Sequence, residues 1–207
     1  MMKQFTIHEG IVAPLDRANV DTEVIIPIGR LISHRRGTLG PFCFEPWRYL
    51  PDGSPDPQFA LNEPRYAGAR ILLGGANFGC GSSREAAVWA LWDLGIRCVI
   101  AESFGDIFRA NCFQNGLLPV TLDAATLAWL TTWAGARRPP LLGVDLQHSR
   151  LLAAGRSIPF VIDPERRTAL LEGLDDIGLT LKSLADIRTF IRRDLATRPW
   201  AQSAGGG

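Results

Sequence analysis

The sequence predicts an α/β domain built on a partly parallel sheet. Between residues 69 and 134, short apolar segments of strand length alternate with segments of helical period. The helix-breaking residues Gly95 and Asn115-Gly116 end two of those helical segments. Strands that alternate with helices form βαβ units, and the strands of such units run parallel. The apolar content of 46% suits a globular protein with a sizeable core.

The first part of the chain predicts one strand and a long irregular region. Residues 5–12 alternate well enough for a strand. A polar segment, 16–23, then precedes the apolar run Val24-Ile25-Ile26. Residues 28–68 are rich in proline, glycine and aromatic side chains, which predicts a structured loop region without regular repeats. Loops of this length inside compact domains are usually functional or disordered, and the aromatic residues argue against disorder.

The middle of the chain supplies the alternating elements. We expect strands at 70–74, 96–101 and 117–122, and helices at 83–94, 105–114 and 123–134.

The last third has a different pattern. Residues 143–152 and 157–162 resemble two paired strands around the turn 154–156. A helix over 164–172 follows. The last helix, 183–195, opens with a capping-box pattern, and its apolar positions predict one stripe that faces the core. Those positions are Leu184, Ile187, Phe190, Ile191 and Leu195. We expect residues 1–200 to form one domain and 201–207 to be a flexible tail.

Charge and cysteine content exclude several classes of protein. The net charge of +1 gives no support to a nucleic-acid or membrane-surface partner. The N-terminus lacks a signal-peptide pattern, and no apolar run reaches the length of a membrane span, so we expect a cytoplasmic protein. The four cysteines show no Cys-x-x-Cys pair and the three histidines no ligand spacing, so we expect no metal site in this chain. The cysteines are Cys43, Cys80, Cys98 and Cys112.

A glycine-rich loop before the helix 83–94 is the strongest candidate for chemistry. It reads Asn77-Phe-Gly-Cys-Gly-Ser-Ser-Arg-Glu85, so that Gly79 and Gly81 precede Ser82, Ser83 and Arg84. Backbone N–H groups and hydroxyls can converge there on an anion at a helix N-terminus, and Arg84 can grip a carboxylate or phosphate. The loop matches neither the dinucleotide fingerprint nor the P-loop. The alternative is that Ser82 or Ser83 caps the helix without a further function.

Several segments together resemble the small subunit of 3-isopropylmalate dehydratase, a family within the aconitase superfamily. The loop 77–85 is similar to the family signature residue for residue, and 19–27 (Asn-Val-Asp-Thr-Glu-Val-Ile-Ile-Pro) is similar to a second family segment. Further similar segments occur at 47–49, 61–66, 103–108, 115–120 and 174–181. The resemblance therefore extends over residues 5–195.

The resemblance implies a three-layer swivelling β/β/α domain like the mobile fourth domain of aconitase. It also implies a large partner subunit that carries a [4Fe–4S] cluster, with the active site between the two subunits. The implied reaction interconverts 2- and 3-isopropylmalate by dehydration and rehydration in leucine biosynthesis.

The resemblance also implies roles for single residues. Ser82 would be the base, as an alkoxide stabilised by N–H donors and positive charge. Ser83 and Arg84 would bind a substrate carboxylate. Arg35 or Arg36 would hold the substrate as well, or these arginines are solvated surface residues. Asp21 and Thr22 would orient the site, or they form a turn. Gly79 and Gly81 would shape the loop.

Three positions depart from the family pattern: Glu23 replaces Asp, Ile28 replaces Lys and Ala86 replaces His. These departures leave two other functions open. One is a related hydro-lyase for homocitrate, citramalate or a dimethylmalate, which an arginine facing into a pocket lined by 28–44 would favour. The other is an assembly subunit without turnover.

Overall fold

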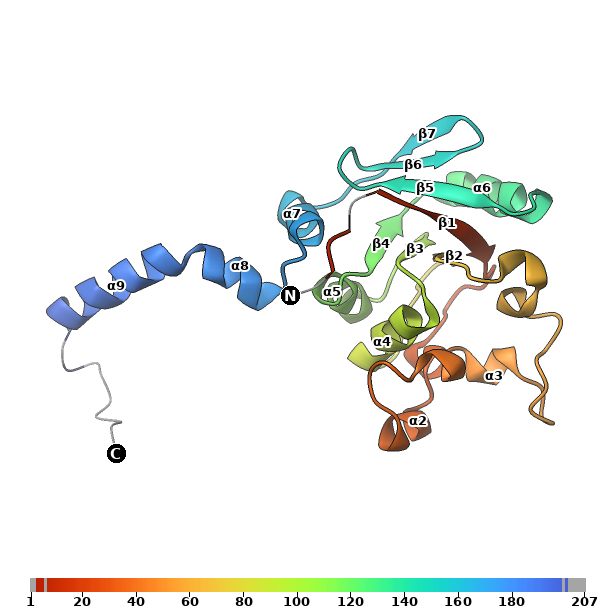
Figure 1. Cartoon of the computed structure of the whole chain (residues 1–207), viewed down its shortest axis with the longest axis horizontal. Coiled ribbons are helices and arrows are strands. Elements are labelled where there is room, and N and C mark those ends of the chain that lie inside the picture. Colours follow the sequence, from red (N-terminus) through yellow and green to blue (C-terminus); the bar gives the residue numbers. More distant parts are fainter. Residues whose placement is uncertain (1–2, 6, 199, 201–207) are drawn as a thin grey trace.

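A mixed sheet organises the computed structural model, which describes residues 3–5, 7–198 and 200 (Figure 1). Within those residues the sheet has seven strands in the order β4-β3-β2-β1-β5-β6-β7. Their bounds are β1 Ile7–Pro14, β2 Ile71–Leu73, β3 Cys98–Ala101, β4 Leu118–Thr121, β5 Leu141–Asp145, β6 Arg150–Ala153 and β7 Arg156–Pro159.

The sheet is parallel on one side of β1 and antiparallel on the other. β1, β2, β3 and β4 pair in parallel, with Ala13 opposite Leu72 and Leu72 opposite Val99. β1 also pairs antiparallel with β5, which continues through β6 to β7. The predicted α/β class with a partly parallel sheet is therefore confirmed. The parallel strands direct the chain segments that follow β1 and β2 to the same edge of the sheet.

Successive residues of the central strands point into two different cores. Ala13, Leu72 and Val99 belong to one core, together with α4 and most of the aromatic residues of the segment 39–66. Their neighbours Ile71 and Cys98 belong to a second core, together with α6 and the strands β5–β7. This alternation is the two-residue period of a strand that is buried on both faces. It explains why the strands read as continuous apolar runs.

The longer helices lie close to their predicted positions. Gly95 ends α4 and Gly173 ends α7 in left-handed conformations that favour glycine. Asp123 and Asp163 cap α6 and α7 through their side chains. The helices in this part of the chain are α4 Glu85–Leu94, α5 Asp106–Gln114, α6 Ala124–Ala136 and α7 Pro164–Glu172.

The region 28–68 is a series of short helical turns that packs on α4. Its aromatic side chains Phe44, Phe59 and Tyr66 are buried, which explains how so long a stretch keeps a fixed shape. Asp93 at the end of α4 accepts the N–H groups of Gly37 and Leu39 and so ties the region to the helix. The turns are α2 Ile28–Ser33, η1 Gly40–Phe42, α3 Glu45–Arg48, η2 Ala60–Asn62 and η3 Pro64–Tyr66, and the short helix α1 Thr22–Ile25 precedes them.

The single strand predicted over 143–152 is wrong, because a turn divides it into β5 and β6. Asp145 accepts the N–H of His148 through Oδ1, and Ser149 adopts a positive φ of 53°. Both features reverse the chain, and the apolar alternation of the sequence does not reveal them. The hairpin at 154–156 is confirmed between β6 and β7.

Two predictions for the last helix are wrong. The chain forms α8 (Asp176–Lys182) and then α9 (Leu184–Thr197), and neither helix has a buried residue. The apolar stripe of α9 therefore does not face the core. The Ser183 side chain makes no capping bond: Ser183 is the single residue between α8 and α9, and its φ of −92° and ψ of 15° lie in the bridge region, not in the extended conformation of an N-cap residue. Figure 1 shows these helices leading away from the sheet.

Within the described residues, no helix is both long enough and apolar enough to cross a bilayer. The tail predicted at 201–207 lies outside those residues.

Candidate functional site

The glycine-rich loop follows β2 and takes a path that requires glycine. Gly79 and Gly81 have positive φ values of 73° and 91°, and Asn77 has one of 57°. A Cβ atom at Gly79 would lie 2.1 Å from Cγ of Phe108. Side chains at both glycine positions are therefore excluded or strained. These glycines bring the loop close against α5 and turn it toward the start of α4.

Two other segments clamp the loop in place. From one side, Gly79 donates its N–H to the carbonyl of Val20 at 2.7 Å, and Asn77 Nδ2 donates to Asn19 Oδ1 at 2.9 Å. From the other side, Ser103 Oγ accepts the N–H of Asn77 at 2.8 Å. The aromatic rings of Phe78, Phe104 and Phe108 pack against one another beneath it. The loop is therefore held by the segments that follow β1 and β3.

Thr22 makes direct contact with Ser82. The Thr22 side chain is 2% exposed, and its Oγ1 donates to the Ser82 carbonyl at 3.1 Å. The same Oγ1 lies 3.2 Å from Ser82 Oγ, and either hydroxyl can donate in that bond. Asp21 caps α1 by accepting the N–H of Val24 and thereby fixes the backbone of Thr22. Asp21 thus caps the turn and also bridges to Cys80 of the loop, and Thr22 contacts Ser82; that the two residues orient an active site stays a prediction.

Neither serine caps α4. The N-cap residue is Arg84, which makes no side-chain capping bond, and both serine side chains are exposed. The first N–H groups of this ten-residue helix therefore lack a side-chain partner, and the helix dipole adds partial positive charge beside them. The simple capping alternative fails, and an anion-binding site at this helix start is chemically possible.

The protein holds one edge of the Arg84 guanidinium group. Its Nη1 donates to the Ile26 carbonyl at 3.2 Å and pairs with Oε2 of Glu23. Oε1 of Glu23 accepts the N–H of Ile28 at 3.0 Å. That N–H, and then Arg84, lower the pKa of Glu23. Within the described chain, Nε and Nη2 of Arg84 have no hydrogen-bond partner, so this edge of the guanidinium can still grip a carboxylate.

A buried polar network between α5 and α4 fixes the first turn of α4. Asn115 is 4% exposed, and its Nδ2 donates to Glu85 Oε1 at 2.8 Å. Its Oδ1 accepts the indole N–H of Trp89 at 3.0 Å. Asn115 is therefore the C-cap residue of α5, and it also fixes the side chain of Glu85, which follows Arg84. Ala86 lies beside this network with its side chain in the core.

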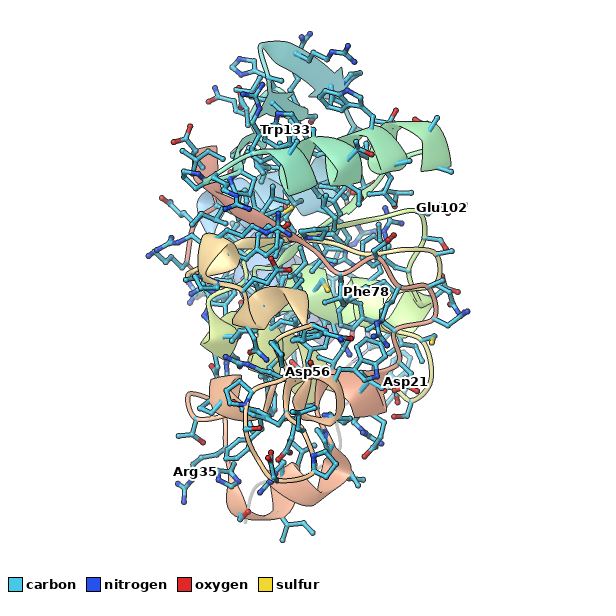
Figure 2. All side chains as sticks on the ribbon, turned by 90° about the vertical axis from the view of Figure 1, so that its right-hand side faces the viewer. Asp21, Arg35, Asp56, Phe78, Glu102 and Trp133 are labelled. Carbon is cyan, nitrogen blue, oxygen red and sulfur yellow. The ribbon has the colours of Figure 1, made fainter. Side chains whose placement is uncertain are left out.

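Arg35 and Arg36 lie toward the other end of α4. The turn that contains them is bound to Asp93, near the C-terminus of that helix, whereas Ser82–Arg84 precede its N-terminus. Arg36 stands over the Trp89 ring at 5.7 Å. Figure 2 shows Arg35 on the opposite side of the view from Asp21, which bridges to Cys80 of the loop. Their contact with substrate stays a prediction.

The described residues do not fit an iron–sulfur cluster. Cys43 and Cys112 lie in one core and Cys98 in the other, and burial raises the pKa of all three thiols. Cys80 lies in the loop, half-buried, and burial followed by the charge of Asp21 raises its pKa. Among the residues that the structure describes, no three His, Cys, Asp or Glu side chains gather as a metal site.

The site is open to one side. A cleft of about 370 Å³ lies where β2 ends, lined by Asp16, Gly74, Gly75 and Glu102 among others, but Ser82–Arg84 are not part of its lining. The two serine side chains instead lie on the exposed surface of the single chain, and the Arg84 side chain beside them is 19% exposed. A second surface is needed to enclose a small substrate there.

Sequence reasoning missed the residues that hold the loop. Asn19 and Asn77 both adopt positive φ values and bond to each other, and Glu23 holds Arg84. Asparagine tolerates the left-handed conformation better than most residues, so the two asparagines, each beside a predicted turn or loop, are a usable signal. The Glu23–Arg84 pair joins residues 61 positions apart in the chain, and no local pattern indicates it.

Comparison with protein families gives two matches. A family model for the aconitase C-terminal domain matches residues 2–125. A second, for the C-terminal domain of the 3-isopropylmalate dehydratase small subunit, matches residues 176–204.

Full-length relatives carry the same name. The 3-isopropylmalate dehydratase small subunit of Magnetococcus marinus is 50% identical, covering 97% of this chain and 99% of the relative. That of Agrobacterium fabrum is 48% identical, covering 97% and 100%. A crystal structure of 3-isopropylmalate dehydratase from Methanocaldococcus jannaschii superposes with a TM-score of 0.65 at 25% identity, covering 89% of this chain and 99% of that chain.

Proposed function

The chain belongs to the family of 3-isopropylmalate dehydratase small subunits, and we propose that its Ser82–Arg84 loop is half of a hydro-lyase active site. The names of the relatives favour 2- and 3-isopropylmalate as substrates over homocitrate, citramalate or a dimethylmalate. They also favour an enzyme subunit over a subunit that serves assembly alone.

The proposed base is Ser82. Dehydration removes a proton from carbon, the C–H electron pair forms the double bond, and the hydroxyl group leaves with its own electron pair from the neighbouring carbon. Serine accepts such a proton only if its alkoxide is stabilised. The Thr22 hydroxyl, 3.2 Å from Ser82 Oγ, can turn its proton from the Ser82 carbonyl to that alkoxide, and the uncapped start of α4 adds positive potential. In rehydration Ser82 returns the proton to the other carbon.

Arg84 and Ser83 form the proposed carboxylate clamp. The Nη1 edge of Arg84 is fixed by Glu23 and Ile26, so the side chain is oriented before a substrate arrives. The Nε–Nη2 edge then meets one substrate carboxylate, and a charge-assisted bond of this kind contributes about 1.5–3 kcal/mol. The exposed Ser83 hydroxyl lies next to it in the chain. Arg35 or Arg36 would reach this site only by a movement of the region 28–44.

The large subunit is the proposed partner. "Small subunit" in the names of the relatives implies a larger one, and the exposed surface around Ser82 requires a covering partner. We infer that the partner carries the [4Fe–4S] cluster, since the cysteines of this chain are dispersed between two cores. When bound, that cluster supplies the Lewis acid that assists departure of hydroxide. The cytoplasmic location stays a prediction.

One observation carries this proposal: Ser82 Oγ lies 3.2 Å from the Thr22 hydroxyl, two residues before Arg84 at an uncapped helix start. The test is turnover by the complex reconstituted with the large subunit and its cluster under anaerobic conditions. We expect isopropylmalate to form the unsaturated intermediate, detected by ultraviolet absorbance, and citramalate and homocitrate to react at least tenfold more slowly. Faster turnover of another diacid would contradict the proposed substrate.

A further inference from the structure

The two C-terminal helices carry a concentration of exposed apolar side chains. We call residues 176–198 with Trp200 the C-terminal arm. Of the 14 exposed large apolar side chains in the described chain, seven belong to this arm, although it is a small part of the chain. They are Ile177, Leu181, Leu184, Phe190, Ile191, Leu195 and Trp200, and Phe190 is 62% exposed. Exposed apolar surface concentrated in this way marks an interaction site.

The apolar positions form one face along both helices. With the partly exposed Ile187 included, they recur every three or four residues from Ile177 to Leu195, and the single residue Ser183 separates α8 from α9. Figure 1 shows α8 and α9 following one another, at an angle, along an arm that leads away from the sheet. Arg188 and Arg192 flank this stripe at helical spacing.

Polar contacts between α8 and the helices α5 and α7 fix the start of the C-terminal arm. Gln114 at the end of α5 donates to Asp176 at 3.0 Å, and Arg166 of α7 pairs with Asp176 at 3.6 Å. Lys182 pairs with Glu172. The side-chain hydrogen bonds found for α9 join residues of that same helix. The body of the protein therefore orients α8 and leaves the apolar face of α9 uncovered.

We propose that the C-terminal arm is the anchor that docks on the large subunit, in an apolar groove with acidic residues at its rim. This inference rests on the proposed function. The family model for the aconitase C-terminal domain ends at residue 125, whereas the arm falls in a model specific to the dehydratase small subunit. A domain within a longer chain is held by its covalent connection, but a separate subunit needs a surface that binds its partner. The arm carries five basic residues against three acidic ones, which suits an acidic rim.

A second copy of this chain fits the surface less well. At 1.5 Å per residue and a radius of about 5 Å, one face of the arm offers about 500 Å². Two arms packed together would bury about 1,000 Å² in total, below the roughly 1,200 Å² at the low end of stable interfaces. A large subunit that covers both the arm and the Ser82 surface buries more. Gly105, the N-cap of α5, bonds to the loop, and Gln114 at the end of α5 bonds to Asp176, so one helix about 13 Å long joins the loop to the start of the arm.

The test compares the dissociation constants of full-length variants for the cluster-loaded large subunit. Phe190→Asp and Leu195→Asp place a charge on the stripe. Thr189→Asp places the same charge on the opposite face of α9 and is the matched control. We expect each stripe variant to raise the Kd at least 30-fold and the control to change it less than threefold. At saturating large subunit, kcat of the stripe variants should stay within threefold of wild type, because the site itself is intact.

Other results would overturn the anchor. These are wild-type affinity in both stripe variants, absence of a complex with the wild-type chain, or a dimer of the chain alone that Phe190→Asp dissociates. The proposed function fails separately: a wild-type complex that forms but turns over no isopropylmalate contradicts the reaction, while the affinity comparison still decides the anchor.

Discussion

Thr22 connects the two chain segments that build the site. It is buried in the turn after β1, yet its hydroxyl reaches both the carbonyl and the hydroxyl of Ser82, 60 positions later. The resemblance of the sequence to a family indicates both residues separately. Their contact depends on the parallel pairing of β1 with β2, which brings the two following segments to one edge of the sheet.

Thr22→Val removes this hydroxyl and keeps the shape of the side chain. We expect kcat of the reconstituted complex to fall about 10²-fold, the loss typical of one donor to a developing oxyanion. Because the Ser82 alkoxide loses a donor, the acidic limb of the pH profile of kcat should move to higher pH. Thr22→Ser restores a hydroxyl and should recover most of the rate. A slower variant with an unchanged pH profile would mean that Thr22 has a structural role alone.

Glu23 contributes to the stability of the fold through its negative charge, because the Ile28 N–H and then Arg84 lower its pKa. A pKa that is lower in the folded chain adds stability above the unfolded value, and this stability is lost as the pH falls through the folded value. Glu23→Gln should therefore lower the free energy of unfolding at pH 7 by less than about 1 kcal/mol, because this carboxylate is half exposed.

Urea unfolding of wild type and Glu23→Gln at several pH values checks this sign. The difference between the two proteins should shrink as the pH drops below about 4.3. A difference that grows toward acid pH would contradict the assigned ion pair.

The conformation of the glycine-rich loop depends on its close approach to α5. Gly79 combines a positive φ with a Cβ position 2.1 Å from Phe108, whereas the loop glycine Gly81 has a positive φ with no neighbour closer than 3.5 Å. The clamp between the segments after β1 and β3 therefore tolerates no larger residue at Gly79. This rigidity presents Ser82 and Arg84 in a fixed geometry, which a preorganised site requires.

Gly79→Ala should lower the free energy of unfolding by about 2–5 kcal/mol, from overpacking and backbone strain together. Gly155→Ala is the matched control, because Gly155 has the same φ of 73° in the β6–β7 hairpin and open space around it. Gly155→Ala should lower the free energy of unfolding by about 1–2 kcal/mol, from backbone strain alone. Urea midpoints at equal m-values measure both. Equal losses in the two variants would contradict the role of the Phe108 contact.

The whole chain shows which features a sequence can predict. The central strands and the helices α4, α5 and α7 follow from apolar periodicity and from end signals such as Gly95 and Gly173. The turn at Ser149 could not be predicted, because it depends on a bond between Asp145 and His148. The exposure of Leu184 and Phe190 could not be predicted either. Amphipathic spacing shows that a helix has an apolar face, but not whether this chain or a partner covers it.

The candidate site also has a part that the sequence predicts and a part that it does not. The loop 77–85 and its serines stand out in the sequence, through composition and through the family resemblance. The supports of the loop, Asn19 with Asn77 and Glu23 with Arg84, are long-range pairs that appear only once the sheet has formed. Half of the site is therefore a local motif, and the other half is a product of topology.

Ser82→Ala in the complex with the cluster-loaded large subunit tests the central claim, that this serine is the base of a shared active site. Ser157→Ala on the edge strand β7 is the matched control. We expect Ser82→Ala to lower kcat for isopropylmalate at least 10³-fold, within the range for loss of a general base, while its affinity for the large subunit stays at the wild-type value. Turnover of Ser82→Ala within tenfold of the Ser157→Ala control would contradict the account.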